Sequence, residues 1–134
     1  MKLNKLTVVL IGQLIIVFLV MGIFRIISDR QIAATIAGLL FVTSPCFWLS
    51  LVWRQVSLKY WWFYLGFLQF WVLFALPIFL LRILNWGAEF ESLSIFGFSG
   101  PFLHQWSSKS YMLMVLTTFL MSRLLRKKHK KPTK

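Results

Sequence analysis

Three long apolar stretches constrain this chain more than any other feature of its sequence. They run over residues 6–27, 32–53 and 60–81. A helix needs about 20 apolar residues to cross a hydrocarbon core of about 30 Å, so each stretch is long enough to span a bilayer. Pro45 and Pro77 lie inside the second and third stretches. They predict kinks there, because neighbouring helices can satisfy the carbonyls that a proline frees.

The composition argues against a soluble fold of this length. Charged residues make up 13% of the 134, against about 25% in a typical soluble domain. A soluble domain this short would leave about a third of its unfolded surface in water. That is too much for a chain that is 59% hydrophobic. We therefore expect an all-α integral membrane protein with a single transmembrane domain over residues 1–125.

A fourth apolar run, residues 110–122, is shorter than the other three. Its 13 residues lie between Lys109 and Arg123. As a helix they would measure about 20 Å, which is less than the hydrocarbon core. Long basic side chains can reach the headgroups at both ends and cover the difference. We predict a fourth span here, and hence a four-transmembrane-helix bundle.

The longest connection, residues 82–109, contains a segment too apolar for an ordinary loop. This segment, residues 95–106, is interrupted by Gly97, Gly100 and Pro101, which are expected to break a long helix. We expect it to lie in the outer interface, or to re-enter the protein where other residues cover its backbone polar groups. The apolar residues that make it a candidate partner interface are Phe96, Phe98, Phe102, Leu103 and Trp106.

Basic residues are distributed unequally between the two ends of the spans. With a cytoplasmic amino terminus, 11 of the 15 Lys and Arg residues fall on the inner side and four on the outer side. The three acids, Asp29, Glu89 and Glu91, all fall outside. The positive-inside rule therefore predicts that both termini are cytoplasmic. Nothing in the chain resembles a eukaryotic targeting signal, which favours a bacterial inner membrane.

The last nine residues, 126–134, form a basic tail that we expect to be disordered and cytoplasmic. Basic residues next to a span attract anionic lipid headgroups, at about 1 kcal/mol for each one close to the surface. The candidates for this contact are Arg126, Lys127, Lys128, Lys130 and Lys131. Nucleic acid is not an expected partner, because the tail lacks aromatic residues that would stack on bases.

Polar and small side chains inside the spans indicate helix packing. Gln13 and Gln69 are the polar side chains nearest the middle of their spans, and in lipid such groups hydrogen-bond to another helix. Ala34 and Gly38 form a small-xxx-small pair, which lets two helix backbones approach closely. A polar lining for a substrate path is the alternative interpretation of the two glutamines.

Residues that could carry chemistry are few. No charged residue or histidine lies at the middle of a predicted span, where ion-coupled transporters place the group that binds a proton or cation. Cys46 is the single cysteine, and we expect it to be a small buried hydrophobe. Glu89, Glu91 and His104 could form an outer acid–base or metal cluster, but their spacing matches no known ligand signature. We therefore predict no catalytic, cofactor-binding or metal-binding residues.

These observations favour a non-catalytic accessory or assembly subunit that packs against larger integral membrane proteins. Aromatic and apolar helices offer large contact surfaces with little polar chemistry. The alternative is a small homo-oligomeric transporter or channel for an uncharged or lipid-linked substrate. A membrane enzyme is the third interpretation, and the lack of a paired acid, base or nucleophile argues against it.

Overall fold

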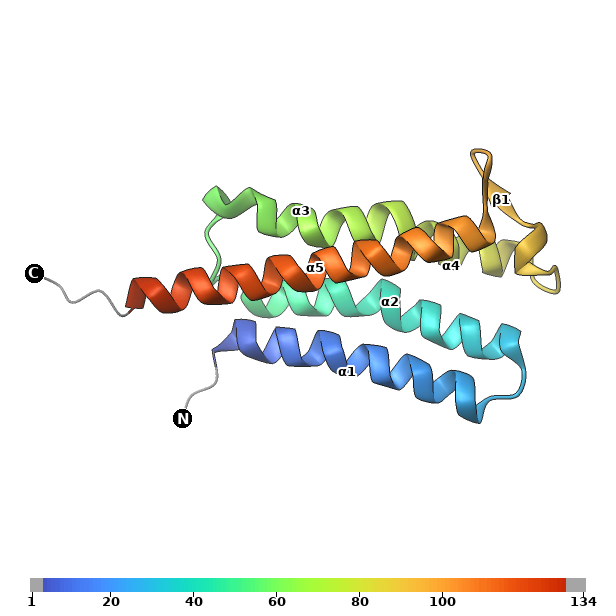
Figure 1. The fold of residues 1–134 in the computed structure, drawn as a ribbon, viewed down its shortest axis with the longest axis horizontal. Coiled ribbons are helices and arrows are strands. Elements are labelled where there is room, and N and C mark those ends of the chain that lie inside the picture. Colours follow the sequence, from blue (N-terminus) through green and yellow to red (C-terminus); the bar gives the residue numbers. More distant parts are fainter. Residues whose placement is uncertain (1–3, 130–134) are drawn as a thin grey trace, which may run out of the picture.

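The computed structural model describes residues 4–129 as a bundle of helical rods that run alternately in opposite directions (Figure 1). The rods are α1 (Lys5–Ile26), α2 (Arg30–Val52), a third rod over residues 58–84, and α5 (Gly100–His129). Among the described residues, the first three rods are long and apolar enough to cross a membrane. The prediction of an all-helical chain with apolar, membrane-compatible helices is confirmed.

Side-chain caps begin the first two helices. Asn4 accepts a hydrogen bond from the Leu6 backbone N–H at 3.3 Å. Asp29 accepts from the N–H groups of Gln31 and Ile32 at 2.9 and 3.1 Å. These side chains satisfy backbone donors that a helix leaves free at its first turn. The cap at Asp29 lets α2 start after a connection of only three residues.

The third rod contains a π-helical turn. It consists of a 3-10 turn (Leu58–Tyr60), α3 (Trp61–Phe70), the π turn (Trp71–Ala75) and α4 (Leu76–Leu84). Pro77 is the second residue after the π turn and lacks the N–H that an uninterrupted α-helix would require there. The wider π turn accommodates this interruption within a continuous rod.

The fourth rod is longer than the sequence predicts. Residues 110–122 belong to α5, whose 30 residues measure about 45 Å. The expectation that Gly100 and Pro101 would break a helix is wrong, because they begin one. Proline is tolerated in the first turn, where its missing N–H would be unpaired in any case. The predicted segment 95–106 is therefore divided between a hairpin and the start of α5.

The start of the basic tail is helical. Residues 126–129 complete α5, so the expectation of disorder from residue 126 onward is wrong for these four, and residues 130–134 lie outside the described residues. Arg126 donates a hydrogen bond to the Thr7 hydroxyl of α1 at 2.9 Å. Lys128 donates to the Tyr60 hydroxyl, and this hydrogen bond raises the pKa of Lys128. Lys130 and Lys131 of the predicted lipid contact are among the residues not described.

A short hairpin precedes α5. Its strands, β1 (Ser94–Ile95) and β2 (Phe98–Ser99), pair antiparallel with Ile95 opposite Phe98. The two turn residues, Phe96 and Gly97, have φ angles of 50° and 81°, as in the two-residue turns that match strand twist. Positive φ is unusual for a bulky residue such as Phe96. The hairpin projects sideways from one end of the bundle (Figure 1).

The core lies mainly where α1, α3 and α5 meet, toward the end that holds the start of α1 and the end of α5. We call this the packed end. The largest fully buried side chains there include Leu6, Phe63, Phe67, Met114 and Met121. Close approach depends on glycines: a Cβ at Gly66 would lie 2.3 Å from the Thr117 hydroxyl oxygen, and one at Gly12 would lie 2.3 Å from the Trp48 ring.

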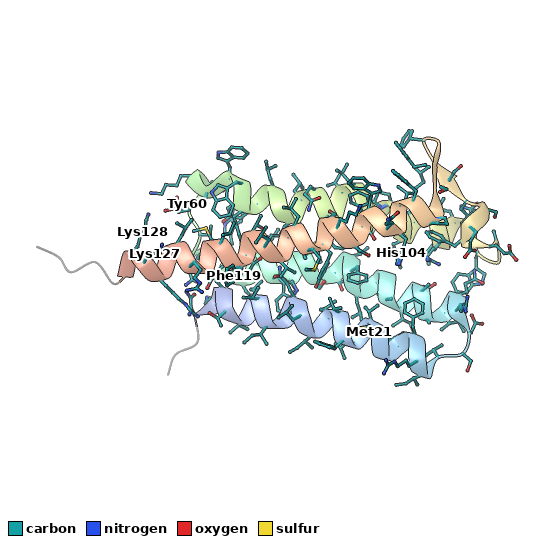
Figure 2. All side chains as sticks on the ribbon, viewed as in Figure 1. Met21, Tyr60, His104, Phe119, Lys127 and Lys128 are labelled. Atoms are coloured by element: carbon teal, nitrogen blue, oxygen red, sulfur yellow. The ribbon has the colours of Figure 1, made fainter. Side chains whose placement is uncertain are left out.

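Figure 2 draws the described side chains on the ribbon. Among them, many large apolar side chains are exposed, and six polar ones are buried: Gln13, Ser44, Ser110, Thr117, Thr118 and Ser122. The Trp71 indole N–H donates to the Val42 carbonyl of α2 at 2.9 Å, so this mid-rod tryptophan packs against a neighbouring helix. Cys46 lies exposed on α2. The prediction that it is buried is wrong, since the small residues on the inner face of α2 are Ala33, Ala34, Ala37 and Ser44.

Candidate functional site

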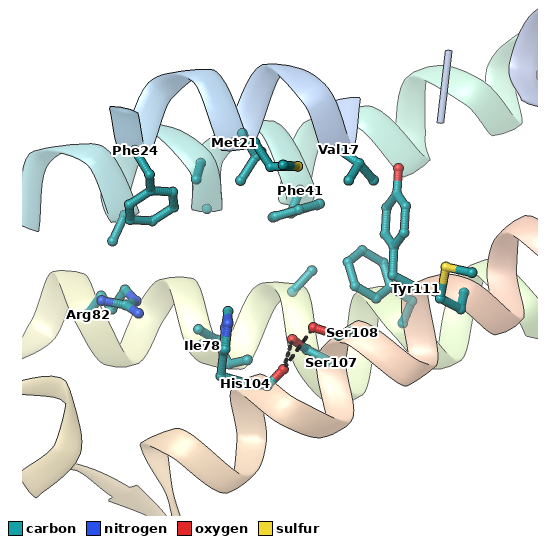
Figure 3. Close-up of a pocket in the computed structure, with 17 residues that line it drawn as sticks. Val17, Met21, Phe24, Phe41, Ile78, Arg82, His104, Ser107, Ser108 and Tyr111 are labelled. Atoms are coloured by element: carbon teal, nitrogen blue, oxygen red, sulfur yellow. Dashed lines mark hydrogen bonds between the residues drawn. The ribbon is translucent and has the colours of Figure 1, made fainter. Parts of the chain in front are cut away.

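A cleft opens between α1, α2, α4 and α5 at the end opposite the packed end (Figure 3). We call this the open end. The cleft has a volume of about 300 Å³, at the lower limit for pockets that bind small ligands. Its walls include Val17, Met21 and Phe24 of α1, Ile78 of α4 and Met112 of α5. These side chains make the interior strongly apolar.

The small residues of α2 explain why the cleft is not filled. Ala34, Ala37 and Gly38 lie at helical spacing along its wall. None of them carries a side chain large enough to reach α1 or α5. Gly38 also receives the Phe79 ring of α4, because a Cβ at this position would lie 2.8 Å from that ring. The predicted pair Ala34 and Gly38 thus sets the spacing between α2 and α4 and lines the cleft.

Three aromatic rings close the inner end of the cleft. Phe41, Phe70 and Tyr111 meet edge to face, with ring centroids 5.1 to 5.9 Å apart. This is a favourable geometry for aromatic pairs. The Tyr111 hydroxyl donates to the Gln13 carbonyl of α1 at 2.6 Å, which fixes the ring across the bundle. The cleft therefore ends against a packed aromatic floor.

The hydroxyl groups along the cleft bond to their own helix. Ser107 and Ser108 donate to the His104 carbonyl at 2.7 and 3.3 Å (Figure 3). Both donors are thus satisfied within α5, and the wall keeps its apolar character. His104 and Arg82 stand toward the outer mouth of the cleft, away from Tyr111 (Figure 3).

A second, polar chamber adjoins the cleft at its outer mouth. Its volume is about 530 Å³, and it shares Phe24, Ala34 and Arg82 with the cleft. The polar and charged residues that line it are Arg30, Gln31, Arg82, Asn85, Glu89 and Glu91. An apolar groove thus runs into a space lined by charges of both signs.

Arg82 is positioned at the junction of these two spaces. Its guanidinium carbon lies 3.8 Å from the centroid of the Phe90 ring, a cation–π contact. The side chain is half-buried, and its five N–H donors have a planar arrangement that suits phosphate or carboxylate oxygens. Sequence reasoning did not select Arg82 or Arg30. Their position on the predicted outer side, against the charge bias, was the available signal.

Glu89, Glu91 and His104 do not form one cluster. The two glutamates line the polar chamber, whereas His104 lines the cleft. Within residues 4–129, no group of three or more His, Cys, Asp or Glu side chains could hold a metal ion. The structure thus brings the two acids and two arginines to one chamber, whereas the histidine lines only the adjoining cleft, which it shares with Arg82.

The two mid-span glutamines bond to α5. The Gln13 side-chain amide donates to the Thr118 hydroxyl at 3.1 Å. That of Gln69 donates to the Ser110 carbonyl at 2.9 Å, and the Ser110 hydroxyl donates back to Gln69. Both glutamines lie outside the cleft lining. They join α1 and α3 to α5.

The predicted interface residues lie in two environments. Phe96 at the hairpin tip is 96% exposed, and Phe98, Phe102 and Trp106 are also exposed. Phe98 stacks on Phe102, with ring centroids 5.2 Å apart. Leu103, in contrast, is buried in the bundle. Four of the five thus form one exposed aromatic surface, which we call the aromatic ridge.

The chain matches no protein-family model, no curated protein and no solved structure. The interpretation of the site therefore depends on its own geometry and chemistry. A narrow apolar groove that leads into a charged chamber has the shape and polarity of a molecule with an apolar tail and a polar head.

Proposed function

We propose that this protein is a non-catalytic, multi-pass membrane protein that binds one lipid-like amphiphile. The observation that carries the proposal is the junction at Phe24, Ala34 and Arg82, where the apolar cleft meets the charged chamber. An acyl or isoprenoid chain enters the cleft, and its headgroup occupies the chamber. This proposal is related to the alternative drawn from the sequence, a transporter or channel for a lipid-linked substrate, and adds a binding site to it.

The proposed topology has four crossings with both termini in the cytoplasm of a bacterial inner membrane. The unequal distribution of basic residues supports this orientation. The start of α1 and the end of α5 lie at the same end of the bundle (Figure 1), as an even number of crossings requires. The proposed fourth span is the apolar run 110–122 of α5, whose flanking basic side chains would have to reach the headgroups at both ends. In this orientation the chamber faces the outer leaflet.

Substitutions that fill the cleft test the proposal. Met21 and Met112 line it and are exposed, so Met21→Trp and Met112→Trp add volume without entering the packed core. Leu19→Trp and Leu113→Trp are matched controls, because these exposed leucines lie on the same helices outside the cleft lining. Native mass spectrometry counts the phospholipids retained after delipidation and incubation with phospholipid vesicles.

We expect one retained phospholipid on the wild type and on both controls, and a several-fold loss on both cleft variants. Equal retention by all five proteins would contradict the proposal. A helical circular dichroism spectrum and a monodisperse elution profile establish that each variant is folded.

A second candidate function, that of an accessory subunit, is favoured by the aromatic ridge. Phe96 is presented at the hairpin tip with a positive φ, and such strained positions cluster at functional sites. The surface offers aromatic residues of the kind enriched at interfaces between proteins. Purification in mild detergent tests this function. A stoichiometric larger membrane protein supports the subunit, whereas a symmetric homo-oligomer alone supports a transporter.

A further inference from the structure

From the charges of the chamber we infer that the amphiphile has a zwitterionic headgroup with a phosphate and a primary ammonium, as in phosphatidylethanolamine. This inference rests on the proposed function and adds the class of headgroup. It follows from the presence of two arginines and two glutamates in one space.

The arginines supply the phosphate side of the site. Arg82 reaches the chamber from the last turn of α4, and Arg30 reaches it from the first residue of α2. The Phe90 ring stacks on the Arg82 guanidinium at 3.8 Å, which orients its donors before a ligand arrives. Because both guanidinium groups line one chamber, they can form charge-assisted hydrogen bonds with the oxygens of one phosphate.

The glutamates supply the ammonium side. Glu89 and Glu91 lie on the connection after α4, where they line the same chamber. A purely anionic headgroup, such as phosphatidylglycerol, would be repelled by both carboxylates. A primary ammonium has three N–H donors for carboxylate oxygens. A quaternary ammonium has none and binds best inside aromatic cages, and the Phe90 ring here already contacts Arg82.

The volumes of the two spaces indicate which part of the lipid each one holds. The chamber of about 530 Å³ takes the headgroup, and the cleft of about 300 Å³ takes part of one chain. The remaining lipid tail lies in the bilayer beside α1 and α4. The site thus recognises a lipid that stays within its leaflet, rather than one extracted from it.

Competition between headgroups tests the inference. The delipidated full-length protein is incubated with mixed vesicles that contain equal amounts of phosphatidylethanolamine, phosphatidylglycerol and phosphatidylcholine. Native mass spectrometry then identifies the bound lipid. We expect phosphatidylethanolamine to exceed each of the others by about tenfold, the factor that one charge-assisted hydrogen bond supplies. A separate arm adds soluble glycerophosphoethanolamine at a concentration matched to the lipid headgroups.

Chamber variants sharpen the test. The double variant Glu89→Gln/Glu91→Gln should lose the preference for phosphatidylethanolamine over phosphatidylglycerol, and Glu89→Lys/Glu91→Lys should invert it. Arg82→Gln should lower retention of both lipids. Arg54→Gln, at the other end of the bundle, is the charge control and should change neither. The two glutamate positions and the control position Arg54 are exposed, so folding is not at risk there.

The outcomes separate the two proposals. If the wild type retains lipid in a cleft-dependent manner without headgroup preference, the zwitterionic inference is overturned and the proposed function stands. If no cleft variant changes lipid retention, the proposed function fails with it. If the soluble headgroup displaces the lipid completely, the ligand is a free phosphoethanolamine compound, and the inference of a lipid is overturned.

Discussion

Two helices of the same apolar rod, α3 and α4, pack in different ways. Every few residues α3 buries a side chain or a glycine, at Phe63, Gly66, Phe67 and Phe70. The nine residues of α4, all of them described, include no buried one. Both helices are apolar enough for a membrane. Hydrophobicity therefore makes the whole rod compatible with a membrane, while the neighbouring helix decides which part of it becomes a core.

The neighbour of α3 is the inner stripe of α5. This stripe repeats at three- and four-residue intervals through Ser110, Met114, Thr117, Thr118 and Met121. Small and polar residues of this kind permit close contact and hydrogen bonds between helices in lipid. Opposite α4 stand the alanines of α2 and the second half of α1, which leave the cleft between them.

The largest difference in stability should appear when one side chain on each helix is replaced by alanine. Phe67→Ala on α3 removes a fully buried ring and should lower the free energy of unfolding by about 3 kcal/mol. This is the low end for such a change, because the transfer contribution is small when both states lie in lipid. Leu80→Ala on α4, at an exposed position, should cost far less. Denaturant titration in detergent micelles measures both, and equal losses would refute the contrast.

A single methyl group tests the packed end more finely. Gly66→Ala would place its Cβ 2.3 Å from the Thr117 hydroxyl oxygen and 3.1 Å from the Thr117 Cβ. We expect a loss of about 1–3 kcal/mol from overpacking. At Gly22 no described heavy atom lies within 4 Å of an added Cβ. Gly22→Ala should therefore be neutral or stabilising in the same denaturant titration, and a loss as large as that of Gly66→Ala would contradict the packing described.

The hydrogen bonds between helices should contribute less to the free energy of unfolding than the close packing does. Gln13→Leu deletes the 3.1 Å hydrogen bond to Thr118, a contact of about 0.6 kcal/mol in membrane proteins. It also removes the buried Gln13 side-chain oxygen, which has no hydrogen-bond partner among the described residues. These two effects oppose each other, so we expect a change within about 0.6 kcal/mol. A loss above 2 kcal/mol, measured by the same titration, would show a larger polar network.

The sequence predicted those parts of the fold that depend on a single kind of residue. Apolar length located the membrane-compatible rods, and Pro77 indicated an interruption in the third one. The length of α5 was missed because Gly100 and Pro101 occur equally well at a helix start as at a break. The contacts that accompany the start of the helix, such as the burial of Leu103 and the bond from the Gly100 N–H to the Leu93 carbonyl, appear only in three dimensions. Residues 126–129 are helical for a related reason, since Arg126 and Lys128 bond to Thr7 and Tyr60.

The cleft could not be predicted from the sequence. It depends on volume that is missing between four helices, and no single residue encodes that volume. Ala34 and Gly38 were selected as a packing pair, but their partner Phe79 and the open space beside them required three dimensions. Arg82 and Glu91 are nine residues apart in the chain, and the turn after α4 brings them to one chamber.

The smallest effect on stability is expected at the aromatic ridge. Phe96→Ser changes a side chain that is 96% exposed, so the melting temperature should be unchanged within error. Whether Phe96 lies against lipid or a partner is tested by how readily a water-soluble reagent reaches this position. In a Cys46→Ser background, a cysteine at position 96 should react slowly with a water-soluble thiol reagent if the ridge lies against lipid or a partner. Rapid labelling in intact membranes, equal to that of a cysteine at position 89, would show a solvated hairpin.

The π turn at residues 71–75 determines the rotation of α4 about its axis. An α-helix advances about 100° per residue, so the additional residue of the π turn turns every later side chain by roughly that angle. Ile78 and Arg82 therefore face the groove, whereas an uninterrupted helix would direct them to another side. Deletion of one residue there, such as the exposed Val72, would leave the composition of the rod almost unchanged. It would also turn Arg82 away from the polar chamber, so under the proposed function this deletion should abolish lipid binding.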